Sequence, residues 1–569
     1  MADTERDGSG GNPDTAIQST DFAATLDAAL DTFTQALIRR WRVDVAIAII
    51  GGDWEAIPEH ARGSVWPFTS RAAREHVVDF DGSPRLCAYL RWVQEGQVEP
   101  LDSVICGGEA HRVTDDGQVH EYWIECGVGS ILEQVADWAY QERQAVAQEL
   151  PLFDHHDLIA LRSAHGTLLD IGSRLGLTAD TGSDPGLLAD DPATRPIPEV
   201  VIRLADEDNQ HTDWWAGWTG LAADRARDGF FASVRPTMSN QAGLAGWLAN
   251  LYNSRAAIIV KGRNDALYWL QWATKSLADK ETVTYDQAAG WKTITGIGMF
   301  VAAAGGWHPA GAIAGAVVQL VGFLGEQLWS KVTAKAYAND RLEVLSQLRD
   351  EIRKLNDDLA THESDYATLQ TQIQAALDGA DSYNVELYDL TRNDPDGTRQ
   401  PGQTGFHVDV EFVLGIAQNC YELAERYADL LPLIRGTEAA DAELADKDGK
   451  QTPADLGVLE LRDLLGEFLK TTAARYQLAG QQTQAAAEAY VAEDESQRDT
   501  LNRILADWRT HGVGDKDLGF DPEEYAQETD RPGLPGVTDT QRDYGVTNPS
   551  EERRELEERQ DAHRERGGD

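Results

Sequence analysis

Cysteine, methionine and basic residues are all scarce in this chain of 569 residues. The 4 cysteines are too few for a disulfide scaffold and form no C-x-x-C pair, so we expect ordinary small core residues. Lys and Arg number 50 against 96 Asp and Glu, which gives a formal net charge of -46 at pH 7. Because this charge repels a phosphate backbone, we expect no nucleic-acid binding.

We also expect no conventional secretory signal peptide. The sequence begins MADTERDGSGGNPDTAIQSTD, with neither a basic n-region nor an apolar h-region. Residues 1–20 are dominated by Gly, Asp, Ser and Thr, and we predict that they are disordered. We expect either a secreted or cell-envelope protein that is exported by another route, or a cytoplasmic protein.

Catalytic motifs are absent as well, since G-x-x-x-x-G-K, G-x-S-x-G and H-E-x-x-H do not occur. A β-hairpin predicted around residues 116–117 would pair Val113 with His120 and place His111, His120 and Asp115 on one face. These residue types could bind zinc, but solvent-facing hairpin residues explain the pattern equally well. We therefore predict no enzyme activity, no cofactor and no metal.

The remaining pattern predicts a mainly α fold, namely an elongated helical bundle or coiled coil with an apolar helical hairpin, plus a small N-terminal α+β domain. Its predicted segments are a disordered start (1–20), a small α+β domain (21–150), a helical region (155–290), an apolar helical hairpin (291–328), a long coiled-coil helix (329–392), a C-terminal helical hairpin (406–510) and a disordered acidic tail (511–569).

Apolar residues at alternating spacings of three and four mark the long helices. Helices are predicted over residues 22–41, 155–176, 240–277, 330–379, 409–434 and 455–508. In the fourth of these, His362 fills the one position of the stripe between Leu359 and Tyr366. The stripe consists of Leu345, Leu348, Ile352, Leu355, Leu359, Tyr366, Leu369 and Ile373.

Residues 293–325, TITGIGMFVAAAGGWHPAGAIAGAVVQLVGFLG, contain no Asp, Glu, Lys or Arg. Residues 305–309 divide this run into two apolar halves, each too short for a bilayer span of ~20 residues. We predict an apolar hairpin between two long amphipathic helices, which is either buried in a bundle or mediates membrane contact or oligomerisation. Its candidate contact residues are Phe300, Trp307, Pro309, Gly311, Gly315, Val318 and Phe323.

Residues 214–231, WWAGWTGLAADRARDGFF, contain two adjacent Trp-x-Gly triplets, at 215–217 and 218–220, followed by an Ala-rich helical face. Tyr-x-x-x-acid patterns occur at 490–494 and at 421–425. Together these motifs resemble the helical-hairpin substrates of type VII secretion, in which Trp-x-Gly lies in the turn between two antiparallel helices. Residues 455–501 also look like the C-terminal part of secretion-associated proteins of that system.

The resemblance implies that Trp218, Gly220, Tyr490 and Asp494 belong to a secretion signal that a secretion ATPase recognises. One departure from the family pattern is the separation of the two motifs by about 270 residues, because the family carries both signals in one hairpin. The expected function is a non-enzymatic, type VII-like secreted or secretion-associated helical protein.

Two other functions fit the same sequence. The position of the uncharged run between long helices is similar to the apolar head of helical pore-forming toxins, which predicts a protein that inserts residues 293–325 into a membrane. A cytoplasmic coiled-coil scaffold is the other alternative. The partners to be expected are accordingly a secretion ATPase or helical protein, a membrane, or further copies of the same chain.

Overall fold

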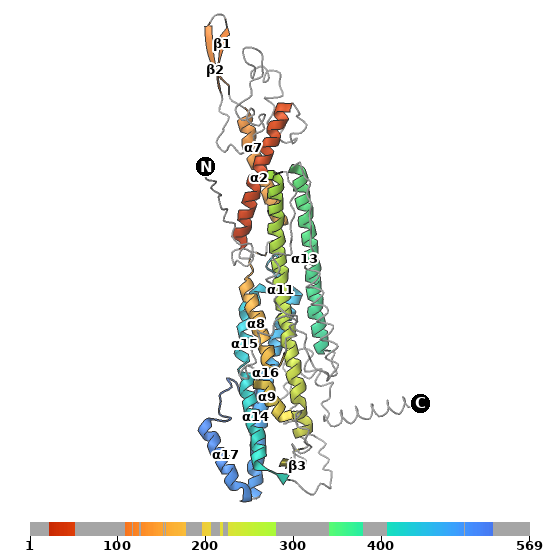
Figure 1. The fold of residues 1–569 in the computed structure, drawn as a ribbon, viewed down its shortest axis with the longest axis vertical. Coiled ribbons are helices and arrows are strands. Elements are labelled where there is room, and N and C mark those ends of the chain that lie inside the picture. The colour runs from red at the N-terminus through yellow and green to blue at the C-terminus, as the bar shows by residue number, and fades with distance from the viewer. Residues whose placement is uncertain are drawn as a thin grey trace, which may run out of the picture. The chain divides into compact units, whose positions relative to one another are not determined.

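The computed structural model describes residues 22–51, 109–115, 118–124, 127–151, 153, 155–177, 196–205, 217–219, 223, 226–279, 341–378, 407–493 and 495–526. In these residues the protein is mainly α-helical, as predicted (Figure 1). The chain divides into two compact units. The first takes its residues from Met1–His155, Ile259–Gly290 and Lys331–Thr361, and the second from His156–Ile258, Trp291–Ser330 and His362–Asp569.

The first unit contains α2 (Phe22–Gly51), β1 (Glu109–Asp115), β2 (Gln118–Ile124) and α7 (Gly127–Glu149). It also receives the later part of α11 (Ala232–Asp279) and the earlier part of α13 (Arg341–Asp378). Helix α2 packs on α7, and the ring centroids of Trp41 and Trp138 lie 5.2 Å apart. The buried face of α2 follows a helical period, with Phe22, Leu26, Leu30, Phe33, Leu37 and Trp41.

Strands β1 and β2 form the predicted antiparallel hairpin. His111 pairs with Tyr122 and Val113 with His120, which is the register expected for a two-residue turn. The structure therefore confirms the backbone pairing that the sequence predicted.

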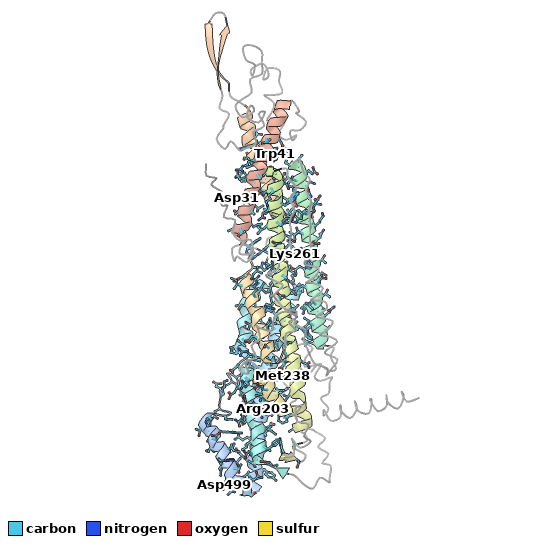
Figure 2. All side chains as sticks on the ribbon, in the orientation of Figure 1. Asp31, Trp41, Arg203, Met238, Lys261 and Asp499 are labelled. Carbon is cyan, nitrogen blue, oxygen red and sulfur yellow. The ribbon has the colours of Figure 1, made fainter. Side chains whose placement is uncertain are left out.

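Ion pairs connect the helices of the first unit. Arg143 of α7 contacts Asp27 and Asp31 of α2, the latter at 3.1 Å. Figure 2 labels Asp31 on α2. Arg341 of α13 lies 3.0 Å from Asp44, and its guanidinium stacks 4.6 Å above the ring of Trp41. Such partly exposed pairs each contribute little, on the order of 0.2–1 kcal/mol, but they fix which helix faces meet.

The second unit is built around α14 (Val410–Ala428) and α16 (Pro453–Glu493), which pack closely against each other. Helix α9 also packs on α14, and α8 lies on the short helical segments between α14 and α16. The other elements that belong wholly to this unit are α8 (Leu158–Arg174), α9 (Pro196–Ala205), β3 (Trp218–Thr219), η4 (Ala226–Phe231), β4 (His407–Val408), α15 (Leu431–Gly436), η6 (Thr437–Glu443), η7 (Glu495–Gln497), α17 (Arg498–His511) and α18 (Pro522–Ala526).

The predicted stripe of α13 is confirmed by burial. All eight of its residues are at most 6% exposed, and His362 is 7% exposed. A histidine therefore occupies a core position of this helix, as its spacing in the sequence indicated.

Several predicted boundaries differ from the structure. The helix expected over 409–434 breaks after Ala428, and the helix expected over 455–508 is divided into α16, η7 and α17. The predicted disordered tail begins too early, because residues 512–526 are ordered and α18 packs on α16. Short turns with left-handed glycines, such as Gly512 with φ 69°, end the helices here without ending the fold.

The segments predicted as a disordered start (1–20) and an apolar hairpin (291–328) lie outside the described residues. Among the helices that the structure describes, none combines the length and the apolar character that a membrane span requires.

Candidate functional site

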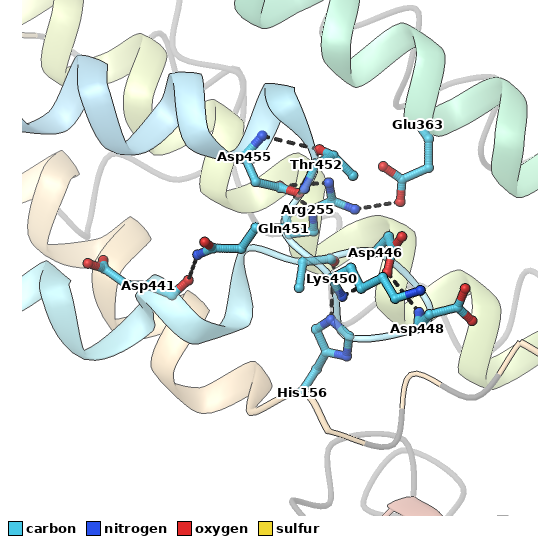
Figure 3. A network of polar contacts seen from close by, with 11 residues as sticks. His156, Arg255, Glu363, Asp441, Asp446, Asp448, Lys450, Gln451, Thr452 and Asp455 are labelled. Carbon is cyan, nitrogen blue, oxygen red and sulfur yellow. Dashed lines mark hydrogen bonds and ion pairs between the residues drawn. The ribbon is translucent and has the colours of Figure 1, made fainter.

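The most concentrated group of buried charges in the second unit surrounds Arg255 of α11. Its side chain is completely buried, and its Nε and Nη2 lie 3.1 Å and 2.7 Å from Oδ1 of Asp455 in α16. Its Nη1 also donates a hydrogen bond to Oε1 of Glu363 in α13 (Figure 3). One guanidinium thus joins three helices through its fixed fork of donors.

Asp455 reaches this position because it belongs to the first turn of α16. Thr452 precedes Pro453, and the Asp455 carboxylate accepts hydrogen bonds from the backbone N and the Oγ1 of Thr452 at 2.8 Å and 2.7 Å. The Thr452 hydroxyl in turn accepts from the backbone N of Asp455 at 3.2 Å. This reciprocal arrangement is a capping box, in which Asp replaces the commoner Glu or Gln. One carboxylate therefore both caps α16 and neutralises Arg255.

The network contains two carboxylates for one guanidinium. Asp455 is fully buried, whereas the Glu363 side chain is 24% exposed. Burial raises the pKa of Glu363, Arg255 opposes this rise, and the Asp455 and Asp446 carboxylates add to it. Burial alone would lower the pKa of Arg255, but Tyr366, Glu363 and Asp455 raise it, so the guanidinium stays charged.

The ring of Tyr366 packs against the guanidinium of Arg255. Its ring centroid lies 4.4 Å from Cζ of Arg255, which is a cation–π distance. The ring is fully buried, and burial raises the pKa of its hydroxyl well above the ordinary value. The tyrosine therefore stays neutral and provides a polarisable surface for the cation.

The loop that leads into α16 is held by its own hydrogen bonds. Asp446 Oδ1 accepts from the backbone N of Asp448 and of Lys450, each at 2.9 Å (Figure 3). Nε2 of the buried His156 lies 3.1 Å from the carbonyl oxygen of Ala445. These hydrogen bonds hold the loop that precedes the capping box of α16.

A second buried arginine, Arg462, lies about two turns after Asp455 on α16. Arg462 contacts Asp441 of η6 and lies 2.8 Å from Asp463, and its charge also acts on the Tyr252 hydroxyl of α11. Burial raises the pKa of Tyr252 to about 12. Arg255 and Arg462 together connect α11, α13, α16 and the segment before α16.

These residues do not assemble the parts of a catalytic centre. The acids of the Arg255 network are engaged by the guanidinium or the helix cap, and no nucleophile lies beside a general base among its members. In the described part of the chain, no group of three or more His, Cys, Asp or Glu side chains could hold a metal ion. The arrangement is suited to holding helices in one register.

Trp218 is buried in the short strand β3, which lies between α9 and α11 in the chain. It pairs with Val408 of β4, and the preceding Gly217 accepts a hydrogen bond from the backbone N of Asp409 at 2.6 Å. A Cβ on Gly217 would lie 2.7 Å from the Phe412 ring, so only glycine fits there. The glycine of the first Trp-x-Gly triplet thus permits close packing on α14. Gly220 lies outside the described residues.

Tyr490 is partly exposed near the end of α16, and Asp494 lies outside the described residues. Beyond them, the side chain of Gln497 donates to Val408 O at 3.1 Å and accepts from Val410 N at 3.0 Å. Since Val408 pairs with Trp218, the segment after Tyr490 reaches the strand pair that holds Trp218. The structure thus connects two regions that are far apart in the sequence.

The candidate residues of the apolar hairpin, from Phe300 to Phe323, lie outside the described residues. Sequence reasoning also missed the Arg255 network. A signal existed, because Arg255 is spaced four residues after Leu251 and three before Ile258, on the apolar stripe of α11. A single arginine at such a position indicates a buried partner.

Comparison with known proteins identifies no relative: no family model, curated protein or solved structure matches the chain.

Proposed function

We propose that the chain is a non-enzymatic, type VII-like secreted or secretion-associated helical protein, and that its apolar hairpin mediates oligomerisation or membrane contact. The observation that carries this proposal is a pair of hydrogen bonds at Gln497, whose side-chain amide donates to Val408 O and accepts from Val410 N. Through them, the end of the Tyr490 segment and the strand of Trp218 meet in one unit. The two motifs are far apart in the sequence, unlike those of the type VII substrates. Their proximity in the fold supports the resemblance in spite of this difference.

The proposal includes a finer description of the fold. The long helices would form an elongated bundle or coiled coil with the apolar hairpin at residues 291–328, and residues 21–150 would form a small α+β domain. The continuous buried stripe of α13 and the β1–β2 hairpin support this description.

The role of the hairpin follows from its position in the chain. Residues 293–325 lie between α11 and α13, and the Arg255–Glu363 contact joins these two helices. A protein that keeps an apolar segment between two helices held by buried charges can control when that segment becomes accessible. The same observation favours the second candidate function, a pore former that inserts residues 293–325.

Export tests the secretion proposal. In the native host, we expect Trp218→Ala and Tyr490→Ala to reduce the amount of protein in the medium by tenfold or more, while the intracellular amount is maintained. Because Trp218 is buried, circular dichroism must show that each variant is folded. Glu488→Ala, an exposed change on the same helix, serves as the control. Unchanged export of both folded variants would rule out the secretion proposal.

Liposome leakage separates membrane contact from the scaffold alternative. We expect the unmodified protein to release dye from vesicles and Gly315→Asp to abolish the release, because a charge within an apolar membrane segment costs about 2.5–3.5 kcal/mol. Asp499→Asn, in α17, provides a control that leaves the hairpin unchanged. An absence of leakage, vesicle binding and oligomer formation by the unmodified protein would favour the scaffold.

A further inference from the structure

Two nitrogen-bearing side chains of α8 lack a partner among the residues that the structure describes. His165 is only 8% exposed, and its Nε2 is shielded from solvent and forms no hydrogen bond. Arg162 is partly buried, and in the described part of the chain it makes neither a hydrogen bond nor an ion pair. A polar group that is withdrawn from water without a partner costs free energy, so both side chains call for an explanation.

Arg162 and His165 belong to one surface of α8. They lie three positions apart in the helix, which makes them neighbours with about 5–6 Å between their Cβ atoms. Helical side chains lean toward the N-terminus of their helix, so the two run in similar directions. A single small ligand can therefore contact both groups. We call these two side chains the α8 pair.

The α8 pair carries one positive charge at pH 7. Burial lowers the pKa of His165 to about 4, so the imidazole is neutral. Burial also lowers the pKa of Arg162, which shows that the guanidinium itself is withdrawn from water, and not only the aliphatic stem. The chain contains 96 acidic residues against 50 basic ones, yet this partly desolvated cation is paired with none of the described carboxylates.

The acids on the elements around α8 are used elsewhere or lie in solvent. Helix α8 packs on η6, α15 and α9. Glu443 of η6 accepts a hydrogen bond at 2.6 Å from the backbone N of the α8 N-cap residue, and Asp441 contacts Arg462. Glu438 of η6 and Glu199 of α9 are exposed. The acids of these elements therefore do not neutralise the α8 pair.

We propose that Arg162 and His165 bind a small oxyanion, namely a phosphate or carboxylate group, on this surface of α8. The planar fork of guanidinium donors matches two oxygens of such a group, and a neutral imidazole donates one further N–H. The oxyanion thereby supplies the partners that the protein does not. This inference goes beyond the proposed function and depends on neither export nor membrane contact.

Histidine NMR of the full chain tests binding, with inorganic phosphate and acetate as separate probes. We expect at least one probe to shift the ring signal of His165 in a saturable manner, and His165→Gln identifies that signal by its loss. Saturation by phosphate alone assigns a phosphate group, and saturation by acetate assigns a carboxylate. His511, which is 65% exposed, reports the general effect of added salt. No saturable shift with either probe, or an equal shift at His511, would overturn the proposal.

Replacement of Arg162 tests its part in binding. Arg162→Gln removes the charge from a partly exposed position, so the fold should be maintained, which circular dichroism checks. We expect this variant to bind the better probe about tenfold or more weakly, as for the loss of a charge-assisted hydrogen bond. Arg174→Gln is the matched control, because Arg174 lies about 18 Å farther along the same helix and is paired with Asp170 at 3.0 Å. Equal affinities of wild type and Arg162→Gln, or equal losses in both variants, would contradict the proposal.

Thermal unfolding gives a second measurement that does not use the histidine signal. A ligand that binds only the folded protein raises the unfolding temperature. Phosphate also stabilises many proteins because it is excluded from their surface, so the informative quantity is the difference between variants. The better probe should raise the unfolding temperature of wild type and Arg174→Gln more than that of Arg162→Gln. The same rise in all three proteins would show that no specific site exists at Arg162.

Discussion

Arg255 and Asp455 lie 200 positions apart in the chain and form an ion pair in which neither side chain is exposed. Removing one partner of such a pair leaves a buried charge without compensation, which is strongly destabilising. The pair therefore determines how the second unit responds to changes at either position. Four predictions follow from this and from other buried contacts.

Replacing Asp455 should destabilise the second unit. We expect Asp455→Ala to lower the free energy of unfolding by about 3–5 kcal/mol, because it removes the carboxylate of the buried pair and the helix cap together. Urea denaturation followed by circular dichroism measures this loss. Asp463→Ala is the matched control on the same helix. Its side chain is 67% exposed and its pair with Arg462 should be worth less than about 1 kcal/mol. Similar losses in both variants would contradict the prediction.

Replacing Glu363 should have an effect that depends on pH. Because burial raises the pKa of Glu363 in the folded protein, its contribution to stability is present below the unfolded pKa and is lost as the pH rises through the folded pKa. Glu363→Gln keeps an oxygen that can accept the hydrogen bond from Arg255, but it does not ionise. We expect the stability of wild type relative to this variant to decline from pH 4 to pH 7, as measured by urea denaturation. The opposite slope would show that Arg255 lowers the pKa of Glu363 by more than burial raises it.

Buried His165 should make the protein sensitive to acid. Burial lowers the pKa of His165 to about 4, and its Nε2 has no hydrogen-bond partner. The unfolded state, with a pKa near 6.5, therefore binds the proton more readily, and stability falls as the pH drops from 6.5 to 4. The loss should reach about 3 kcal/mol, since one pKa unit corresponds to about 1.4 kcal/mol.

The variant His165→Leu should remove this part of the pH dependence. His511, whose side chain is 65% exposed, is the matched control, and His511→Leu should keep the wild-type slope. Thermal unfolding at several pH values between 4 and 7 measures both. Identical slopes for wild type and His165→Leu would rule out this histidine as the source.

Adding a methyl group at Gly262 should destabilise the first unit. A Cβ there would lie 2.3 Å from the Phe153 ring, and the Phe153 carbonyl is already held by the fully buried Arg263 at 2.7 Å. Gly262→Ala should therefore cost about 1–3 kcal/mol through overpacking. Gly166→Ala, in a helix with open space around its Cα, should instead stabilise by about 0.5–1 kcal/mol. Differential scanning calorimetry of both variants measures whether Gly262→Ala lowers the unfolding temperature and Gly166→Ala raises it.

Local periodicity accounts for the parts of the fold that the sequence predicted well. The α13 stripe and the register of the β1–β2 hairpin depend on residues close together in the chain, so their spacing is sufficient evidence. Helix ends were predicted less well. The break after Ala428 is followed by the short helix α15, which begins at Leu431 and Pro432. Because α15 continues the apolar pattern, the sequence does not reveal the break between the two helices.

Contacts between distant segments explain what the sequence could not predict. The capping-box pattern of Thr452 and Asp455 is visible in the sequence, but the match of Asp455 with Arg255 depends on how the helices pack. Trp218 was expected in a turn between helices, yet the residue forms a two-residue strand with a partner some 190 positions away. The order of residues 512–526 also arises from contacts with α14 and α16 and not from their own apolar content.

The double use of the Asp455 carboxylate has a consequence for the order of folding. An isolated α16 could form its capping box at once, because Thr452 and Asp455 are local, and this first turn would then carry an unshielded negative charge into the interior. Burying this carboxylate without Arg255 would leave a charge without compensation, so closure of the interior around the start of α16 is coupled to the docking of α11. Protection of the first amide groups of α16 against hydrogen exchange during refolding would thus report when α11, which carries Arg255, has docked against α16.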